Sequence, residues 1–502
     1  MSTQKTSWSF QDTSLGQSFF WSLAVTALPV VTGFIVSWVI ARWAGVTAIG
    51  TVSWVMSFAT MLEIPGKFGM DLSASQMASE YGVKQPGRLR ALFRTSMTLR
   101  LVFTLSVALV AFLFAAPIAR FFKDPGLTVP VRLGAVILVC ASLYEFKENF
   151  LIGLNRLKTV YKIRGLHLSL RIVVTCVLVF MGAGATGILG GYCAAWFVAI
   201  AFFWALLLRS LPPADPTPDP GGHAKRLLGL STALAVSSAS VTLYSHMDRL
   251  ILGYFSGVWE VGQYTVARNI AEVSLFPVFA AMMMLRPALA ARYSSGSVTD
   301  CSRIIRKTLR YTFVSGILFC TLFAALSVQL VTFVFSDKFD YSGRLLFLYV
   351  GVVAFRSVGA VILPALVAAE KSRLYAYLTI ISAVLYFLLS IVLIPRLEAR
   401  GAIVAMMLSY GVLMVIGLRA VFRIYRIRLG WGPLSLPVRT ILAGTVAGGI
   451  TWWLVGQAPF HLNVVLGAVL ASVLYLFLVL AFRVCTFSDL RSLGSNLRKS
   501  KG

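Results

Sequence analysis

Hydrophobic residues occur along this chain in long continuous runs, not in the alternating pattern of half-buried strands. A run of about 20 apolar residues can cross a hydrocarbon core of about 30 Å as a helix, in which each backbone group bonds within its own segment. We therefore expect an all-α integral membrane protein with about 14 transmembrane helices. The predicted segments lie approximately at residues 17–40, 47–66, 96–119, 132–153, 160–181, 186–208, 227–254, 260–285, 309–335, 344–368, 374–394, 401–421, 436–456 and 462–482.

Composition and charge support a membrane protein and give its orientation. Hydrophobic residues make up 58% of the chain and charged residues 13%, which excludes an ordinary soluble domain. The formal net charge is +27, and Lys and Arg gather in the even-numbered connections and the carboxyl-terminal tail. Positively charged connections stay in the cytosol, so we expect both termini there and no nucleic-acid partner. No connection is long enough for a soluble catalytic domain.

The chain also repeats itself weakly at an offset of about 212 residues. The pattern predicts two parallel six-helix repeats that form two lobes around a central cavity. The domains would be a first lobe at 1–210, a Pro-rich cytosolic linker at 211–225, a second lobe at 226–425, and a further helix pair with a basic cytosolic tail at 426–502. The matching positions are Gly45 and Gly257, Gly50 and Gly262, Pro65 and Pro277, Tyr81 and Tyr293, Arg94 and Arg306, Phe121 and Phe333, and Arg132 and Arg344.

Motifs of enzymes and cofactor sites are missing or accidental. Gly182, Gly184 and Gly187 satisfy a GxGxxG pattern, but they join two membrane segments and follow no strand. The six cysteines show no CxxC spacing. We therefore expect no enzymatic activity, no cofactor and no metal.

The predicted spans nevertheless contain many ionisable side chains. Each charge facing lipid near the bilayer centre would cost about 2.5 to 3.5 kcal/mol, so most must pair with one another or line a shared interior. Arg100 and His167 lie near predicted cytosolic helix ends, where we expect snorkelling or end packing. The residues that we assign to ion coupling or charge pairing are Glu63, Glu145, Lys147, Glu148, Asp248 and Glu272.

One constellation indicates a binding site. Tyr264, Arg268 and Glu272 follow at intervals of four and so share a helix face, although Arg268 and Glu272 could simply satisfy each other. Arginine stays charged and binds phosphate oxygens in a bidentate fork. A chamber lined by several arginines would therefore suit diphosphates and acidic sugars. The predicted substrate-binding residues are Arg171, Arg249, Tyr264, Arg268 and Arg356.

Two stretches carry a resemblance to a known family. Residues 248–271, DRLILGYFSGVWEVGQYTVARNIA, resemble the seventh-to-eighth helix signature of the polysaccharide flippases, the polysaccharide transporter branch of the multidrug/oligosaccharidyl-lipid/polysaccharide exporter superfamily. Residues 41–50, ARWAGVTAIG, resemble the matching turn of the first lobe. The final helix pair resembles that of the fourteen-helix lipid II flippases, whose added helices suggest a lateral groove for a polyprenyl tail or simple packing.

The resemblance implies a transporter that flips undecaprenyl-diphosphate-linked oligosaccharide, such as an O-antigen or exopolysaccharide unit, across the bacterial cytoplasmic membrane by alternating access. Arg268 matches an arginine that relatives carry on the eighth helix. Expected partners are the polyprenyl-diphosphate-linked glycan, the bilayer, and glycan polymerase and assembly proteins. A drug/cation antiporter of the same superfamily is the alternative, and a membrane glycan polymerase or ligase a more distant one.

Overall fold

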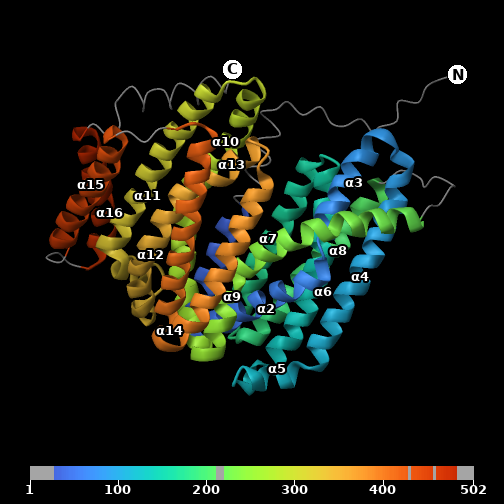
Figure 1. Ribbon diagram of the computed structural model, residues 1–502. Helices are drawn as coiled ribbons and strands as arrows, with labels where there is room; N and C mark the ends of the chain where they lie inside the picture. The colour runs from blue at the N-terminus through green and yellow to red at the C-terminus, as the bar shows by residue number, and fades with distance from the viewer. Residues whose placement is uncertain (1–27, 211–219, 428–430, 456–459, 483–502) are drawn as a thin grey trace. The chain divides into compact units, whose positions relative to one another are not determined.

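The computed structural model describes residues 28–210, 220–427, 431–455 and 460–482. Within these ranges the regular elements are helices (Figure 1). In the described part of the chain, ten helices are long and apolar enough to cross a membrane. The expectation of an all-α, multi-pass membrane protein is confirmed, whereas the count of 14 helices and the two repeats stay predictions.

The first compact unit comprises residues 1–262. Helix α6 lies at its centre and packs against α2, α3, α4 and α8. Aromatic and aliphatic side chains of α3, α4, α6 and α8 share one core. After a helix at 28–39, the elements are η1 (Ile40–Ala44), α2 (Val46–Lys67), α3 (Met70–Lys84), η2 (Pro86–Arg88), α4 (Leu89–Leu113), α5 (Ala115–Phe121), η3 (Pro125–Leu127), α6 (Thr128–Gly153), α7 (Leu157–Phe180), α8 (Ala185–Ser210) and most of α9 (Pro220–Ser274).

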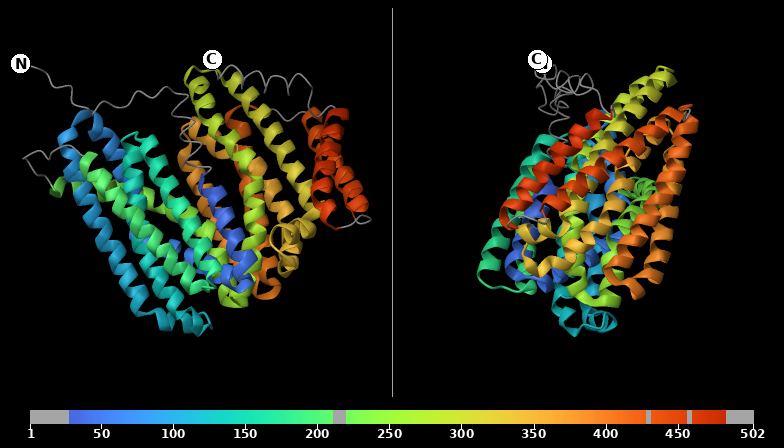
Figure 2. Two further views of the ribbon diagram at one scale, coloured as in Figure 1. Left: turned by 180° about the vertical axis from the view of Figure 1, so that it is seen from behind. Right: turned by 90° about the vertical axis from the view of Figure 1, so that its left-hand side faces the viewer.

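The second compact unit comprises residues 263–502. Helix α11 packs against α10, α12, α15 and α16, and the last two helices lie side by side (Figure 2). After the end of α9, the elements are α10 (Phe276–Ser294), α11 (Val298–Val334), η4 (Asp337–Phe339), α12 (Asp340–Gly359), α13 (Ile362–Ala368), α14 (Ser372–Ile424), α15 (Trp431–Val455) and α16 (Phe460–Ala481).

Several predicted segments do not coincide with single helices of the structure. Helix α14 contains two predicted segments, separated by non-helical backbone angles at Glu398. Helix α9 contains one predicted segment and the beginning of the next, separated by non-helical angles at Gly257. The predicted segment 260–285 is split between α9 and α10, where Pro277 lies in the first turn of α10. Proline favours such a position because its nitrogen has no hydrogen to donate. Of the first predicted segment, residues 17–27 lie outside the described residues.

The predicted linker and lobe boundaries follow the sequence repeat, whereas the compact units follow packing. Residues 211–219 of the linker lie outside the described residues, and α9 already begins at Pro220, so residues 220–225 are helical instead of linker. The packing boundary falls inside α9, after Gly262. The basic tail from residue 483 lies outside the described residues, and the predicted lobes stay predictions.

Gly45 and Gly257, which are 212 residues apart, have the same unusual backbone conformation. Their φ and ψ angles are 89° and −177° at Gly45, and 84° and 174° at Gly257. Side chains clash with the backbone at such angles, so glycine is strongly favoured at both positions. Each glycine immediately precedes a helical stretch. Residues 41–50 and 248–271, the two stretches that carry the family resemblance, therefore share this local backbone geometry.

Candidate functional site

Two arginines of the second unit converge on one carboxylate. Arg356, from α12, donates to Glu272 of α9 across 2.9 Å between Nη1 and Oε1. Arg268, one helical turn before Glu272, places its Nε 3.5 Å from the same Oε1 atom. Arg268 is 8% exposed, and the side chain of Arg356 is 18% exposed. This Arg268–Glu272–Arg356 cluster carries two positive charges for one negative charge, a formal excess of +1.

Aromatic rings surround the guanidinium group of Arg356. Its Cζ atom lies 5.9 Å from the ring centroid of Phe279 and 5.4 Å from that of Tyr410. Ring faces attract a cation without neutralising it, so they hold the guanidinium in place and leave its charge available. Tyr264 is fully buried, with its ring 5.9 Å from that of Tyr349.

The arginines predicted for the first unit lie apart from each other in separate helix contacts. Arg249 of α9 donates from Nη1 to Ser57 of α2 across 3.3 Å. Arg171 of α7 lies over the ring of Tyr192 of α8, at 4.3 Å. Arg249 is therefore placed between α2 and α9, and Arg171 between α7 and α8. The role of both in substrate binding stays a prediction.

The acidic residues predicted for the first unit are mostly paired. Lys67 binds both Glu63 and Glu145, and thereby joins α2 to α6. Arg164 of α7 donates to Glu148 of α6 across 2.6 Å.

Two further candidates have other surroundings. Lys147 is 1% exposed, and its ammonium group lies 4.4 Å from the ring centroid of Trp204. Asp248 accepts a hydrogen bond from the backbone of Arg249, at 2.9 Å. These contacts place the residues, but they do not test ion coupling.

Arg100 neither snorkels nor packs at a helix end, the two arrangements expected from the sequence, because it lies eleven residues after the first residue of α4. It is fully buried, donates from Nε to Ser142 across 2.8 Å, and pairs with Asp71 at 3.2 Å. Burial raises the pKa of the Asp71 carboxyl, against the influence of Arg100 and Lys67. The prediction failed because Arg100 faces α3 and α6, where a polar partner is within reach. His167 is also buried in the middle of α7, ten residues after its first residue, between the rings of Tyr144 and Trp196.

Sequence reasoning missed three of the residues that complete these contacts. Lys67 was absent from the candidates because it lies at a predicted span end, although its position four residues after Glu63 was a usable signal. The signals for Ser57 and Asp71 are weaker, since both act on partners that are distant in sequence.

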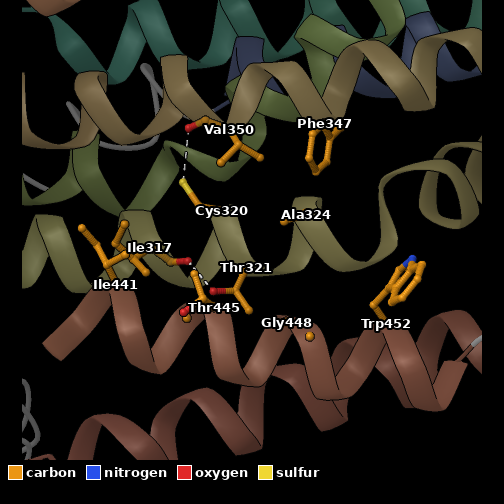
Figure 3. A pocket seen from close by; sticks show the side chains of 12 residues that line it. Ile317, Cys320, Thr321, Ala324, Phe347, Val350, Ile441, Thr445, Gly448 and Trp452 are labelled. Atoms are coloured by element: carbon orange, nitrogen blue, oxygen red, sulfur yellow. Dashed lines mark hydrogen bonds between the residues drawn. The ribbon is translucent and has the colours of Figure 1, made fainter. Parts of the chain in front are cut away.

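A cavity of about 480 Å³ lies between α11, α12 and α15, within the second unit (Figure 3). Its polar side chains are already used: Thr321 donates to the carbonyl of Ile317, Thr445 to that of Leu442, and Cys320 to that of Val350. The wall that remains is apolar, and the volume is in the range of about 300 to 1,000 Å³ that is typical of ligand pockets. The lining residues are Ile317, Cys320, Thr321, Ala324, Phe347, Val350, Ile441, Gly444, Thr445, Gly448, Gly449 and Trp452.

Comparison with known proteins identifies the family. The family model described as "Polysaccharide biosynthesis protein" matches residues 15–293, which is more than half of the chain. The chain belongs to this polysaccharide biosynthesis protein family. The match includes α2 to α9 and all but the last residue of α10, and therefore contains Arg268 and Glu272 but not Arg356.

Relatives of this member of the polysaccharide biosynthesis protein family extend over most of its length. It is 23% identical over 418 residues to a probable low-salt glycan biosynthesis flippase, Agl15, of Haloferax volcanii, a match that covers 81% of this chain and 84% of the relative.

Two solved structures show the same fold. The lipid II flippase MurJ in an inward closed conformation matches with a TM-score of 0.72 and 12% identity, covering 91% of this chain and 97% of the other. An inward-facing multidrug resistance MATE family transporter of the MOP superfamily matches with a TM-score of 0.64 and 13% identity, covering 81% of this chain and all of the other.

Proposed function

We propose that this protein flips a polyprenyl-diphosphate-linked oligosaccharide from the cytosolic to the external leaflet by alternating access. The Arg268–Glu272–Arg356 cluster carries the proposal. Two guanidinium groups with one carboxylate between them can accept a further anion, and a diphosphate offers the oxygen geometry that arginine binds in a bidentate fork. A site for a cationic drug would need an excess of carboxylates.

In this proposal, the carboxylate of Glu272 takes the place of the substrate diphosphate when no substrate is bound. Between transport cycles its carboxylate holds Arg356 at 2.9 Å, which avoids an uncompensated buried charge. The entering diphosphate competes for the same guanidinium groups. When the glycan leaves, Glu272 takes its place again, so the site releases its product instead of trapping it.

The apolar cavity beside α15 fits the other end of such a substrate. A polyprenyl chain is a pure hydrocarbon. The cavity is lined mainly by hydrocarbon groups, and the hydroxyl and thiol groups in its wall already form hydrogen bonds within the protein. The proposal therefore places part of the polyprenyl chain in this cavity. The names of the relatives, a glycan biosynthesis flippase and a lipid II flippase, agree with a lipid-linked substrate.

The proposal includes a setting in the cell. The protein would lie in the bacterial cytoplasmic membrane with both termini in the cytosol, and its lobes would comprise residues 1–210 and 226–425. Glycan polymerase and assembly proteins would act on the flipped product. The excess of Lys and Arg in the even-numbered connections supports this orientation.

Reconstitution with a fluorescent polyprenyl-diphosphate oligosaccharide tests the proposal. We expect vesicles with the wild-type protein to move the lipid between leaflets, and Arg268→Ala to slow this movement by about a hundredfold, equivalent to about 3 kcal/mol. Arg303→Ala is the matched control, because Arg303 forms an ion pair with Asp300 while its side chain is 81% exposed. Equal rates in empty and wild-type vesicles would contradict the proposal.

A further inference from the structure

Within the first unit, α9 approaches the α2–α3 segment very closely at two separate places. At the first place, a Cβ atom on Gly69 would collide with the carbonyl oxygen of Ser231 and lie 2.8 Å from the backbone nitrogen of Ala235. The hydroxyl groups of Ser73 and Ser231 are 3.0 Å apart. We call these four residues the α3 crossing. The helices touch there through backbone and small side chains.

An exposed ion pair follows on the outer side of the α3 crossing. Arg226 of α9 places its Nη2 atom 2.6 Å from Oε2 of Glu80 on α3, and its guanidinium group also contacts Tyr81. Both charged side chains are more than one third exposed. Exposed ion pairs contribute little to stability, so this contact can break and form again readily.

The second place has a twofold symmetry that follows the sequence repeat. A Cβ atom on Gly50 would collide with the carbonyl oxygen of Val258, and one on Gly262 would collide with that of Val46. Val46 and Val258 are 212 residues apart, as are Gly50 and Gly262. Each repeat therefore contributes the same glycine and the same carbonyl. We call these four residues the Gly50 crossing.

The two crossings are separated by about the thickness of a membrane core. Gly50 lies 17 residues before the end of α2 at Lys67, which at about 1.5 Å per helical residue is roughly 26 Å, and Gly69 follows two residues later. The hydrocarbon layer is about 30 Å thick. Arg249, a predicted substrate residue, contacts Ser57 between them. Basic residues follow the α3 crossing at Lys84 and Arg88, so this end faces the cytosol in the proposed orientation.

We propose that the α3 crossing is the cytosolic gate and the Gly50 crossing the external gate of the transport cycle. This inference rests on the proposed flippase function and names the contacts that open in turn. Small residues let two helices meet without interlocking side chains, so the surfaces can part without repacking of a core. Arg226 and Glu80 act as a reversible latch on the cytosolic gate. The interval between the two crossings, where Arg249 contacts Ser57, opens to one side at a time.

The first test locks the cytosolic gate. The pair Ser73→Cys and Ser231→Cys replaces two touching hydroxyl groups with thiols, and an oxidant closes the disulfide. We expect flipping in vesicles to fall by about tenfold or more on oxidation and to return on reduction. The matched controls are the single variants Ser73→Cys and Ser231→Cys, which each carry one of the two new thiols and cannot form this disulfide. Their flipping should be equal before and after oxidation.

The second test measures coupling between the gates without a transport assay. Gly50→Ala adds a methyl group that the closed external gate cannot hold, so it favours states with the cytosolic gate closed. We expect the disulfide between the residue 73 and residue 231 thiols to form several-fold faster in this background. Gly190→Ala is the control, because a Cβ atom there meets nothing within 4 Å.

Each outcome decides a separate claim. Flipping that continues after oxidation of the 73–231 pair overturns the cytosolic gate and leaves the proposed function intact. If the reduced Ser73→Cys and Ser231→Cys protein does not flip the lipid, the rate of disulfide formation tests the gates instead. Equal rates in the Gly50→Ala and Gly190→Ala backgrounds would overturn the coupling between the two gates. If wild-type vesicles do not flip the lipid, the proposed function fails, whereas the rate comparison still tests the two crossings.

Discussion

The ion pairs around Lys67, Arg100 and Arg164 and the Arg268–Glu272–Arg356 cluster are balanced in opposite ways. In the first unit, Lys67, Arg100 and Arg164 face four carboxylates, which leaves a formal excess of one negative charge. In the second unit, Arg268 and Arg356 share Glu272, which leaves an excess of one positive charge. The first arrangement ties helices together, and the second can accept an anion. An ionisable residue within a span is therefore informative only together with its partners.

The largest expected effect comes from breaking the first arrangement. Lys67→Met would leave Glu63 and Glu145 close together without their cation, and loss of one partner from a buried ion pair costs about 3 to 5 kcal/mol. We expect a marked fall in the thermal unfolding temperature in detergent, measured by tryptophan fluorescence. Adding Glu145→Gln should restore much of it. An unfolding temperature unchanged by Lys67→Met would contradict the structural role assigned to the Lys67 ion pairs.

Removing a cation from the second unit should affect transport more than stability. In Arg356→Ala, Glu272 keeps Arg268 as a partner, so we expect the unfolding temperature to change little. The flipping rate should fall by about tenfold or more, since one of two phosphate ligands is lost. A protein with normal flipping and lowered stability would instead assign Arg356 to helix packing. Arg303→Ala again serves as the surface control.

Removing the carboxylate should tighten binding and slow release. Glu272→Gln takes away the group that competes with the diphosphate for Arg268 and Arg356. We expect a soluble short-chain prenyl diphosphate to bind roughly tenfold more tightly, equivalent to about 1.4 kcal/mol, and turnover to decrease. Titration calorimetry measures the first and vesicle flipping the second. Weaker binding would show that Glu272 contacts the substrate favourably.

The smallest effect concerns the apolar cavity. A Cβ atom on Gly448 would make ordinary contacts at 3.5 Å with Thr321, so Gly448→Leu should fold and fill part of the space. We expect KM to rise a few-fold for a long polyprenyl substrate and to stay unchanged for a short-chain analogue. Val446→Leu, on an exposed face of α15, is the control. Equal effects on KM for the long and the short substrate would show that the polyprenyl chain binds outside this cavity.

The fold could be predicted from the sequence because lipid imposes a simple rule, that apolar runs of sufficient length become helices. Breaks within helices were harder to predict. Glu398 has a positive φ angle, which glutamate rarely adopts, so the residue type does not indicate a break there. Gly257 was easier, because its match with Gly45 marked a special position.

The candidate site was predictable only where partners lie close in sequence. The four-residue spacing of Arg268 and Glu272 indicated a shared face, and the structure places them 3.5 Å apart. Arg356 was a candidate by its burial in an apolar segment, but its pairing with Glu272 depends on how α12 packs against α9. Arg100 was misjudged for the same reason, because its partner lies on a different helix.

The sidedness of the lipid-linked oligosaccharide in cells tests the central claim most directly. A deletion strain would be complemented with the wild-type protein or with Arg268→Ala, at equal expression by immunoblot. The account predicts that the lipid accumulates on the cytosolic leaflet of the deletion strain, that the wild-type protein restores its export, and that Arg268→Ala does not. Normal sidedness in the deletion strain, with no second flippase present, would contradict the glycan assignment and favour the antiporter.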